Sequence, residues 1–559
     1  MRRVNLLAAS AIAAMFVVLS LVPLTRTALR FDMQLAAGKP ILGRMLVDLG
    51  LKQEDMPFGG MGPAISTTPD TRAADSPELP VRLANAMQLS GRVKWGALQK
   101  LVAEFPENLA VHAALARIAC KNGGSVGVGH DAEQYELLAS PPPSSPTKSS
   151  ANPDDARVML RSCESGERLA PDNAYFPAMA AIAHFSLNND TEARAALHRA
   201  AQKPRWQEYL DVEAAGRVRR AELLFGPQNT LTKTVVYASI LFPHYAALRG
   251  MARVVTAQAM HAEQSGDFKT GLALRHDTAQ LGAKMREQSS SLIGSLVGTA
   301  MIRVAEGRPG GAPALKADEE SKSKETETRF LAYLAANGQA AEAAWWQKQL
   351  VACDESRAMV KHTDASVLGG TAFFATPWKL LANLALLSVA SLLCILGGLA
   401  FLQPWLGRKT QHLAPVIAVA AFMVILSGAA WQSLGNCRDF MALSGLIQGL
   451  SGSESVDTTW SVIKQTIQGE ISLIVLVLLT PFVYLATVAF QTLKKRGSLT
   501  ARIRQTALPL AAVLTLAYAV HLTAFALRER VIERQLRQVL THEGRFIAAQ
   551  IGKEWPTVP

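Results

Sequence analysis

The stretch ISLIVLVLLTPFVYLATVAFQTLKKR (residues 471–496) joins a long apolar run to a basic end. The apolar part, residues 471–492, is long enough to cross a bilayer as a helix, which takes about 20 apolar residues. Comparable apolar runs occupy residues 4–24, 379–402, 413–434 and 505–527. The sequence therefore predicts an all-α protein with five transmembrane helices, one near the N-terminus and four in the C-terminal part.

Basic residues beside these runs predict how the helices are oriented. The short connections on one side contain no Asp or Glu but hold the topology-setting residues Arg408, Lys409, Lys494, Lys495 and Arg496, together with Arg2, Arg3, Arg502 and Arg504. Short loops rich in Lys and Arg stay in the cytoplasm. We therefore expect a cytoplasmic N-terminus, with residues about 25–377 and the C-terminal tail exterior to the cytoplasmic (inner) membrane of a bacterium.

The first apolar run has two interpretations. A charged start followed by an apolar run is typical of a cleaved signal peptide and of an uncleaved anchor. The run from Val4 to Leu24 is longer than a usual signal-peptide core, and no small-x-small cleavage site follows it. We favour the uncleaved anchor and keep the signal peptide as the alternative.

Composition separates the chain into segments with different properties. We expect an anchor (1–25), a juxtamembrane segment and linker (26–80), a helical-repeat exterior domain (81–305) with a flexible insert (139–153), a linker (306–327), a helical pair (328–377), a four-helix transmembrane bundle (378–527) and an amphipathic tail (528–559). The linkers are rich in Gly, Pro, Ser or charge, so they bury little apolar surface. The tail has one apolar face, and we expect that face to dock on protein.

Charge and cysteine patterns exclude several kinds of site. Nine of the 57 Lys and Arg residues lie in the cytoplasmic connections, which leaves 48 against 45 acidic residues. This balance, without a basic stripe, argues against a nucleic-acid partner. The cysteines lack metal-ligand spacing, so we expect no metal and no cofactor. They are either isolated buried thiols or exterior cysteines that form disulfides: Cys120, Cys163, Cys353, Cys394 and Cys437.

Short helical hairpins recur in residues 81–305, and residues 174–204 are the clearest example. On the second helix of this hairpin Ala193, Leu197 and Ala200 recur at i, i+4 and i+7, and therefore share one face. Pro204 ends the helix. The preceding helix ends in the same way, with Cys163, Gly166, Leu169 and Pro171, and a more degenerate pair at 245–287 turns at Gly266.

The segment LAPDNAYFPAMAAIAHFSLNNDTEARAALHRAAQKP (169–204) resembles the tetratricopeptide repeat (TPR) family in its small residues, turn and closing Pro. The resemblance implies a stack of TPR-like hairpins with a concave face for protein partners, and no chemistry. The repeat-core residues that it implies are Cys163, Pro171, Ala193, Leu197, Ala200 and Gly266. Pro177 and Ala181 depart from the family pattern. The alternative is an ordinary all-α domain built from helical hairpins.

Catalytic motifs are absent from the sequence. It has no H-E-x-x-H, no G-x-S-x-G and no Walker loop, and the Gly-rich run at 123–129 lacks a Lys. His130, His184 and His521 are the only candidates for enzymatic chemistry, and we expect no enzyme. His521 is the single Asp, Glu, Lys, Arg or His in the interior of the C-terminal apolar runs. Its place near the outer end predicts an interfacial residue rather than a proton relay.

These observations favour a multi-pass membrane protein that presents an exterior TPR-like domain for protein–protein interaction, as a scaffold or in assembly. Its expected partners are other proteins and the lipid bilayer, with a homo-oligomer as a further option. The alternative is a transport or channel component whose four C-terminal spans form the pathway. A membrane enzyme that uses one of the three histidines is the third hypothesis.

Overall fold

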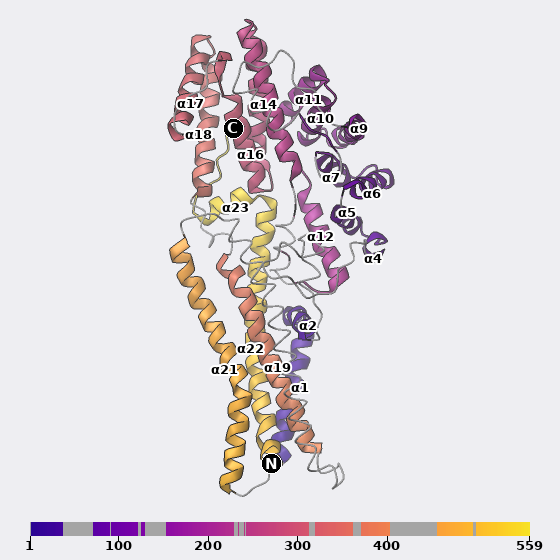
Figure 1. Ribbon diagram of the computed structural model, residues 1–559, viewed down its shortest axis with the longest axis vertical. Coiled ribbons are helices and arrows are strands. Elements are labelled where there is room, and N and C mark those ends of the chain that lie inside the picture. Colours follow the sequence, from indigo (N-terminus) through magenta and orange to yellow (C-terminus); the bar gives the residue numbers. More distant parts are fainter. Residues whose placement is uncertain are drawn as a thin grey trace. The chain divides into compact units, whose positions relative to one another are not determined.

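The computed structural model describes residues 2–36, 71–89, 91–120, 125–128, 152–228, 233, 240, 242–311, 319–361, 370–402, 456–495 and 499–558. Every element in these ranges is helical, apart from an isolated bridge between Asn173 and Arg205 (Figure 1). The all-α prediction is therefore confirmed. The predicted run 413–434, Cys437, His130 and the basic residues Arg408, Lys409 and Arg496 lie outside the described residues.

The chain folds into two compact units, and the first holds the apolar helices. We call it the membrane unit; it comprises Met1–Thr67, Ala221–Val235 and Asp364–Gln535. Its helices are α1 (Arg2–Leu21), α2 (Pro23–Ala36), α19 (Gly370–Leu402), α21 (Val456–Lys495) and most of α22 (Leu499–Thr541). Lys494 and Lys495 stand at the end of α21.

Among the described residues of this unit, four helices are long and apolar enough to cross a membrane, in the stretches Arg3–Leu21, Trp378–Gly398, Gln468–Thr492 and Ala501–Thr541. In α19 72% of the apolar stretch is buried, against 22% in α21, so α19 lies at the centre of the bundle. The outer helices expose large apolar side chains such as Leu476, Val483 and Phe490. Such a surface is unfavourable in water and favourable against lipid, consistent with a membrane protein.

The second unit, the helical unit, comprises Thr68–Arg220, Val236–Thr363 and Leu536–Pro559. Its helices are α4 (Thr71–Ala74), α5 (Leu79–Gln88), α6 (Gly91–Glu104), α7 (Leu109–Ala119), α9 (Pro153–Leu169), α10 (Tyr175–Ser186), α11 (Asp190–Gln202), α12 (Leu210–Phe225), α14 (Pro243–Gln264), α15 (Phe268–Gln288), α16 (Leu292–Ala305), α17 (Glu319–Ala336), α18 (Ala340–Lys361) and α23 (Glu543–Gln550), with a 3₁₀ turn at Pro309–Gly311. The last turns of α12 belong to the membrane unit.

Consecutive helices of this unit pack as antiparallel hairpins. The pairs α5/α6, α7/α9 and α10/α11 follow one another, and each helix contacts the next along the chain. The longer helices α14, α15 and α16 form a second group, in which α15 and α16 cross closely at Gly282 and Gly298. A Cβ on Gly298 would lie 2.3 Å from the Gly282 carbonyl oxygen, so this crossing needs a glycine.

The last residues of the chain pack on the helical unit. His542 Nε2 donates to the Glu287 carbonyl at 2.8 Å, and Trp555 Nε1 donates to the Arg286 carbonyl at 3.0 Å. Glu543 accepts a hydrogen bond from the Leu292 amide at 2.7 Å. The amphipathic tail is therefore docked on protein, as its composition predicts.

Helix α17 begins at Glu319, inside the segment 306–327 that we expected to be a linker. Charged residues predict a solvated linker, but Glu and Lys are also good helix formers. Here Arg329 pairs with Glu325 at 2.8 Å across one helical turn, which supports a helix. The buried Trp346 of α18 packs edge-on against Phe330 of α17 and holds the pair together.

Candidate functional site

Four of the six predicted repeat-core residues lie on packed helix faces. Cys163 of α9 and Ala193, Leu197 and Ala200 of α11 are all at most 1% exposed. Gly166 also abuts the neighbouring hairpin, because a Cβ there would lie 2.2 Å from the Phe176 ring. Leu197 and Ala200 follow Cys163 and Gly166 at the same offset along the chain.

The remaining predicted positions lie at turns or on partly exposed faces. Pro171 directly follows α9, where it is exposed. Gly266 adopts a φ of +88° in the turn between α14 and α15, a backbone conformation that favours glycine. His184 of α10 is half-buried, and burial lowers the pKa of its imidazole. Cys120, Cys163, Cys353 and Cys394 are free thiols.

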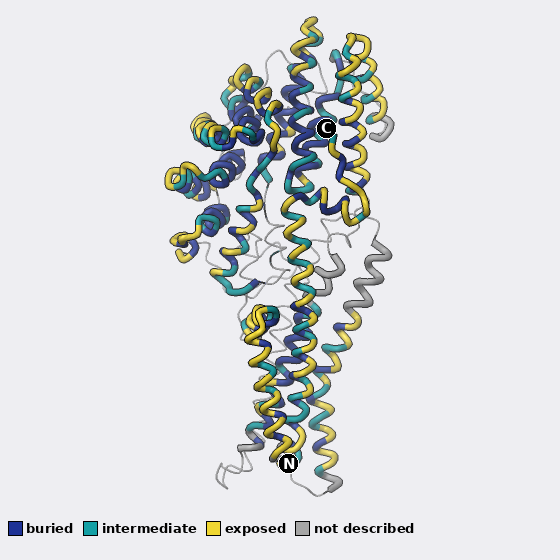
Figure 2. Tube along the Cα trace, turned by 180° about the vertical axis from the view of Figure 1, so that it is seen from behind, coloured by how far each residue is buried: buried dark blue, intermediate teal, exposed yellow. Residues whose placement is uncertain are grey.

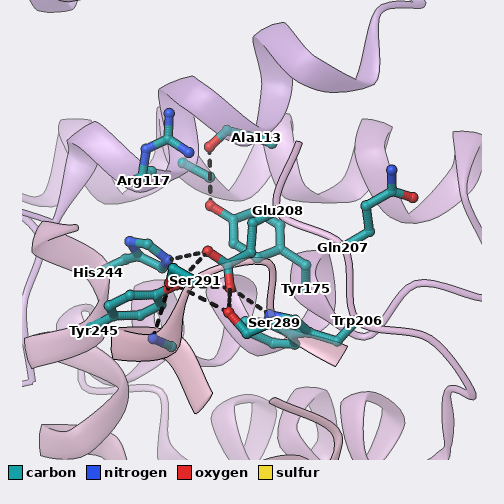
Figure 3. Close-up of polar contacts among 12 residues, drawn as sticks. Ala113, Arg117, Tyr175, Trp206, Gln207, Glu208, His244, Tyr245, Ser289 and Ser291 are labelled. Atoms are coloured by element: carbon teal, nitrogen blue, oxygen red, sulfur yellow. Dashed lines mark hydrogen bonds and ion pairs between the residues drawn. The ribbon is translucent and has the colours of Figure 1, made fainter. Parts of the chain in front are cut away.

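A buried polar cluster of the helical unit is centred on Glu208 (Figure 3). Its carboxylate accepts hydrogen bonds from Trp206 Nε1 at 2.5 Å, Tyr245 OH at 2.9 Å and Ser289 Oγ at 3.3 Å. His244 Nε2 lies 3.2 Å from Oε2, the carboxylate oxygen that also accepts the 2.9 Å hydrogen bond from Tyr245. Because Glu208 and His244 are at most 1% exposed in their side chains, the cluster has no access for a substrate.

Electrostatics explain how this buried charge is stabilised. Burial opposes the charge of Glu208, but its hydrogen bonds to His244, Trp206 and Tyr245 outweigh burial and keep the pKa of the carboxyl below its usual value. Burial lowers the pKa of the His244 imidazole. A carboxylate with four polar partners is typical of a buried structural network. We therefore interpret this cluster as a hydrogen-bond network that stabilises the fold, and not as a functional site.

Helices α12 and α14 determine which face of the hairpin stack is exposed. Helix α12 covers α5, where Arg220 Nε donates to Asn85 Oδ1 at 3.0 Å and a Cβ on Gly216 would lie 2.1 Å from the Pro80 carbonyl oxygen. Helix α12 also reaches α7, where Arg117 forms a buried ion pair with Glu213. Helix α14 contacts α7 and α10. The face formed by α5, α7 and α10 is therefore covered by the protein's own helices.

The opposite face is exposed and charged. The helices α6, α9 and α11 alternate buried apolar positions with exposed ones, as Figure 2 shows for the outer parts of the stack. Its exposed charged residues carry both signs: Arg92, Lys100, Glu104, Asp154, Arg157, Arg161, Glu164, Arg168, Glu192 and Arg199. The mixed charge of this face distinguishes it from the covered face, whose residues in α7 and α10 are mainly buried.

The membrane unit holds a second polar cluster that connects three helices. Lys379 Nζ of α19 lies 2.6 Å from Glu470 Oε1 of α21, and His521 Nε2 of α22 lies 3.1 Å from Glu470 Oε2. The other ring nitrogen, Nδ1, lies 2.6 Å from Asn383 Oδ1 of α19. One turn earlier on α22, Tyr518 donates to Asp32 Oδ2 of α2 at 3.1 Å.

Two protonation states fit the geometry around His521. Both ring nitrogens face oxygen acceptors, which suits an imidazolium that donates to Asn383 and Glu470. A neutral ring also fits if the Asn383 amide is turned by 180°, because its Nδ2 is buried without a partner among the described residues. In either state the two ring nitrogens of His521 link α22 to Asn383 of α19 and to Glu470 of α21.

Several of these residues were missed by sequence reasoning. Glu208, His244 and Ser289 are far apart in the sequence and belong to no motif. Lys379 is the first residue of the predicted run 379–402, and Glu470 directly precedes the run 471–492, so a search of the run interiors passes over both. The topology prediction places both at the exterior end of their helices, and their opposite charges were a signal that could have suggested a pair.

Comparisons with known proteins identify no relative. No protein-family model, no curated protein and no solved structure matches this chain.

Proposed function

We propose that this is a multi-pass membrane protein of the bacterial cytoplasmic membrane that presents a TPR-like helical domain to protein partners outside the cytoplasm. Its role would be that of a scaffold or an assembly factor. Two observations support the proposal. Small residues recur at the same spacing along the chain in successive helical hairpins, and the chain also has apolar helices long enough to cross a membrane.

The covered face refines where a partner would bind. TPR-like stacks commonly hold ligands on their concave face, but here α12 and α14 cover the face of α5, α7 and α10. We place the partner surface on the outer face of α6, α9 and α11 instead. Its exposed charges of both signs favour a folded protein with a complementary polar surface.

Photocrosslinking in native membranes tests this placement. A photoreactive amino acid replaces Arg161 of α9, and a second variant carries it at Arg329 of α17; both side chains are exposed in the helical unit. We expect recurrent adducts with other membrane or exterior proteins from position 161 and few from position 329. Adducts only with a second copy would indicate a homo-oligomer, and equal yields from both positions would contradict the proposed surface.

The polar cluster at His521 favours the alternative, a transport component. Ionisable side chains within a membrane bundle often mark a pathway for ions or protons. Proteoliposomes loaded with a pH-sensitive dye test it. The external pH is lowered, and the dye reports how fast protons enter the vesicles. Entry that is faster with the protein than in empty vesicles, and that is not faster with His521→Phe, would favour transport over a scaffold.

A further inference from the structure

A cleft of about 320 Å³ opens in the membrane unit beside α2 and α22. Its lining residues all belong to this unit. The apolar wall includes Leu24 and Ala28 of α2 and Phe525 of α22, together with Phe31, whose side chain is 3% exposed. A volume at the lower end of the range for ligand sites fits a small group and not a large one.

The rest of the lining is charged, with both signs present. Three carboxylates line it, from Glu222, Glu529 and Glu533, and two cations, from Lys233 and Arg530. Lys233 Nζ lies 3.1 Å from Glu533 Oε1. A ligand that carries both a cation and an anion is complementary to such a lining.

A buried amide adds a preference for a hydrogen-bond donor. Gln228 is 4% exposed and lines the cleft, and its Nε2 donates to the Gly226 carbonyl at 2.7 Å. Its Oε1 is buried without a partner among the described residues. A buried acceptor without a donor costs free energy, and an N–H group from a ligand would remove that cost.

The cleft also lies at the end of membrane-spanning stretches. Pro23 and Leu24 follow the apolar stretch Arg3–Leu21 within a few residues. On α22 the lining changes from Phe525 and Ala526 to Glu529 and Arg530 within one turn. This change from apolar to charged residues along one helix is typical of the level where lipid headgroups meet acyl chains.

We propose that this cleft binds the headgroup of a zwitterionic phospholipid with a primary ammonium group. Arg530 contacts the phosphate, the carboxylates of Glu529 and Glu222 accept the ammonium N–H groups, and the first acyl carbons lie against Phe31 and Phe525. A trimethylammonium headgroup has no N–H to donate, and a glycerol headgroup has no cation. The site therefore distinguishes phosphatidylethanolamine from phosphatidylcholine and phosphatidylglycerol. The proposal depends only on the apolar helices crossing a membrane, and not on the proposed protein partner.

Native mass spectrometry of the full-length, delipidated protein tests the site. The protein is titrated in detergent with the three lipids, all with the same acyl chains. We expect phosphatidylethanolamine to bind at lower concentrations than the other two. Because a charged hydrogen bond is lost, Arg530→Gln should weaken its binding by roughly tenfold. Glu529→Gln should reduce the preference over phosphatidylcholine.

Arg534→Gln is the matched control, one turn along α22. Its side chain is exposed and does not line the cleft, so lipid binding should not change. Soluble glycerophosphoethanolamine should fail to compete, because it lacks the acyl chains. Equal binding of the three lipids, equal effects of Arg530→Gln and Arg534→Gln, or full competition by the soluble headgroup would each overturn the proposal. Circular dichroism checks that each variant is folded.

Discussion

His521 shows at the residue scale how one side chain connects three helices. Its ring bonds to Asn383 of α19 and to Glu470 of α21, which also pairs with Lys379. Removing the ring leaves a buried amide and a carboxylate with one partner fewer. Polar contacts between membrane helices are worth little individually, because the alternative state also finds partners. The role of His521 in stability is therefore measurable but modest.

We expect His521→Phe to lower the free energy of unfolding by about 1–2 kcal/mol. The measurement is unfolding of the purified protein in mild detergent by added dodecyl sulfate. Thr523→Val is the control on the same helix, since the hydroxyl of Thr523 donates to the Ala519 carbonyl of α22 itself, at 2.7 Å. If both variants lost the same stability, the contacts of His521 would not be energetically important.

At the scale of single elements, α23 is held by a histidine at its N-terminus. His542 Nδ1 accepts the Arg545 amide at 2.9 Å, while Nε2 donates to the Glu287 carbonyl. This arrangement requires a neutral ring. Burial and the nearby positive charge of Arg545 lower the pKa of His542 to about 4. Protonation would remove the acceptor that caps the helix.

Docking of the tail should therefore weaken in acid. An unfolded histidine has a pKa of about 6.5, so the contribution of His542 is complete above that pH. It falls progressively as the pH drops towards 4, by roughly 3 kcal/mol in total. Hydrogen exchange of residues 543–551, corrected for intrinsic rates, should accelerate between pH 7 and pH 5. His542→Asn retains a capping acceptor that does not titrate, and exchange that stays equally pH-dependent in this variant would contradict the assignment.

The comparison of sequence and structure is also clearest at the level of elements. Apolar runs, basic loops and helix-ending prolines are local signals, and they predicted the α-helical composition, the apolar helices and the packed faces of α9 and α11. The Glu208 cluster joins residues up to 81 positions apart, which no local pattern encodes. The first half of helix α17, residues 319–327, was predicted to be a linker because a charged stretch is equally typical of a linker and of a solvated helix.

At the scale of the whole molecule, helix directions constrain the topology of the membrane unit. Asn383 and Gly397 of α19 lie beside His521 and Leu508 of α22, so these two helices are antiparallel. Helix α21 is antiparallel to α22 as well, because Glu470 contacts His521 while Tyr484 contacts Thr506. Helices α19 and α21 are therefore parallel. Two parallel spans require the chain to return across the membrane between them.

We therefore predict an odd number of crossings between residues 403 and 455, in agreement with the apolar run 413–434 and a total of five spans. Thr410 and Ser453 are replaced one at a time by cysteine in a cysteine-free background. Labelling with a membrane-impermeant maleimide then shows on which side of the membrane each position lies. Ser453→Cys should react on the same side as Arg329→Cys in the helical unit, and Thr410→Cys only after the membrane is opened. Reaction of Thr410→Cys and Ser453→Cys from one side would rule out an odd number of crossings.

The docked tail has a consequence for the order of synthesis. Helix α23 and Trp555 complete the helical unit, yet the ribosome makes them after α19, α21 and α22. At a rate of about 5–20 residues per second, the rest of that unit waits roughly 10–40 seconds for its last helix. During this interval the surface around Met359 and Leu292 lacks the cover of Ala548 and Trp555. In a chain that stops early or fails to insert its last helix this apolar surface stays uncovered, and exposed apolar surface makes a partly folded chain prone to aggregation.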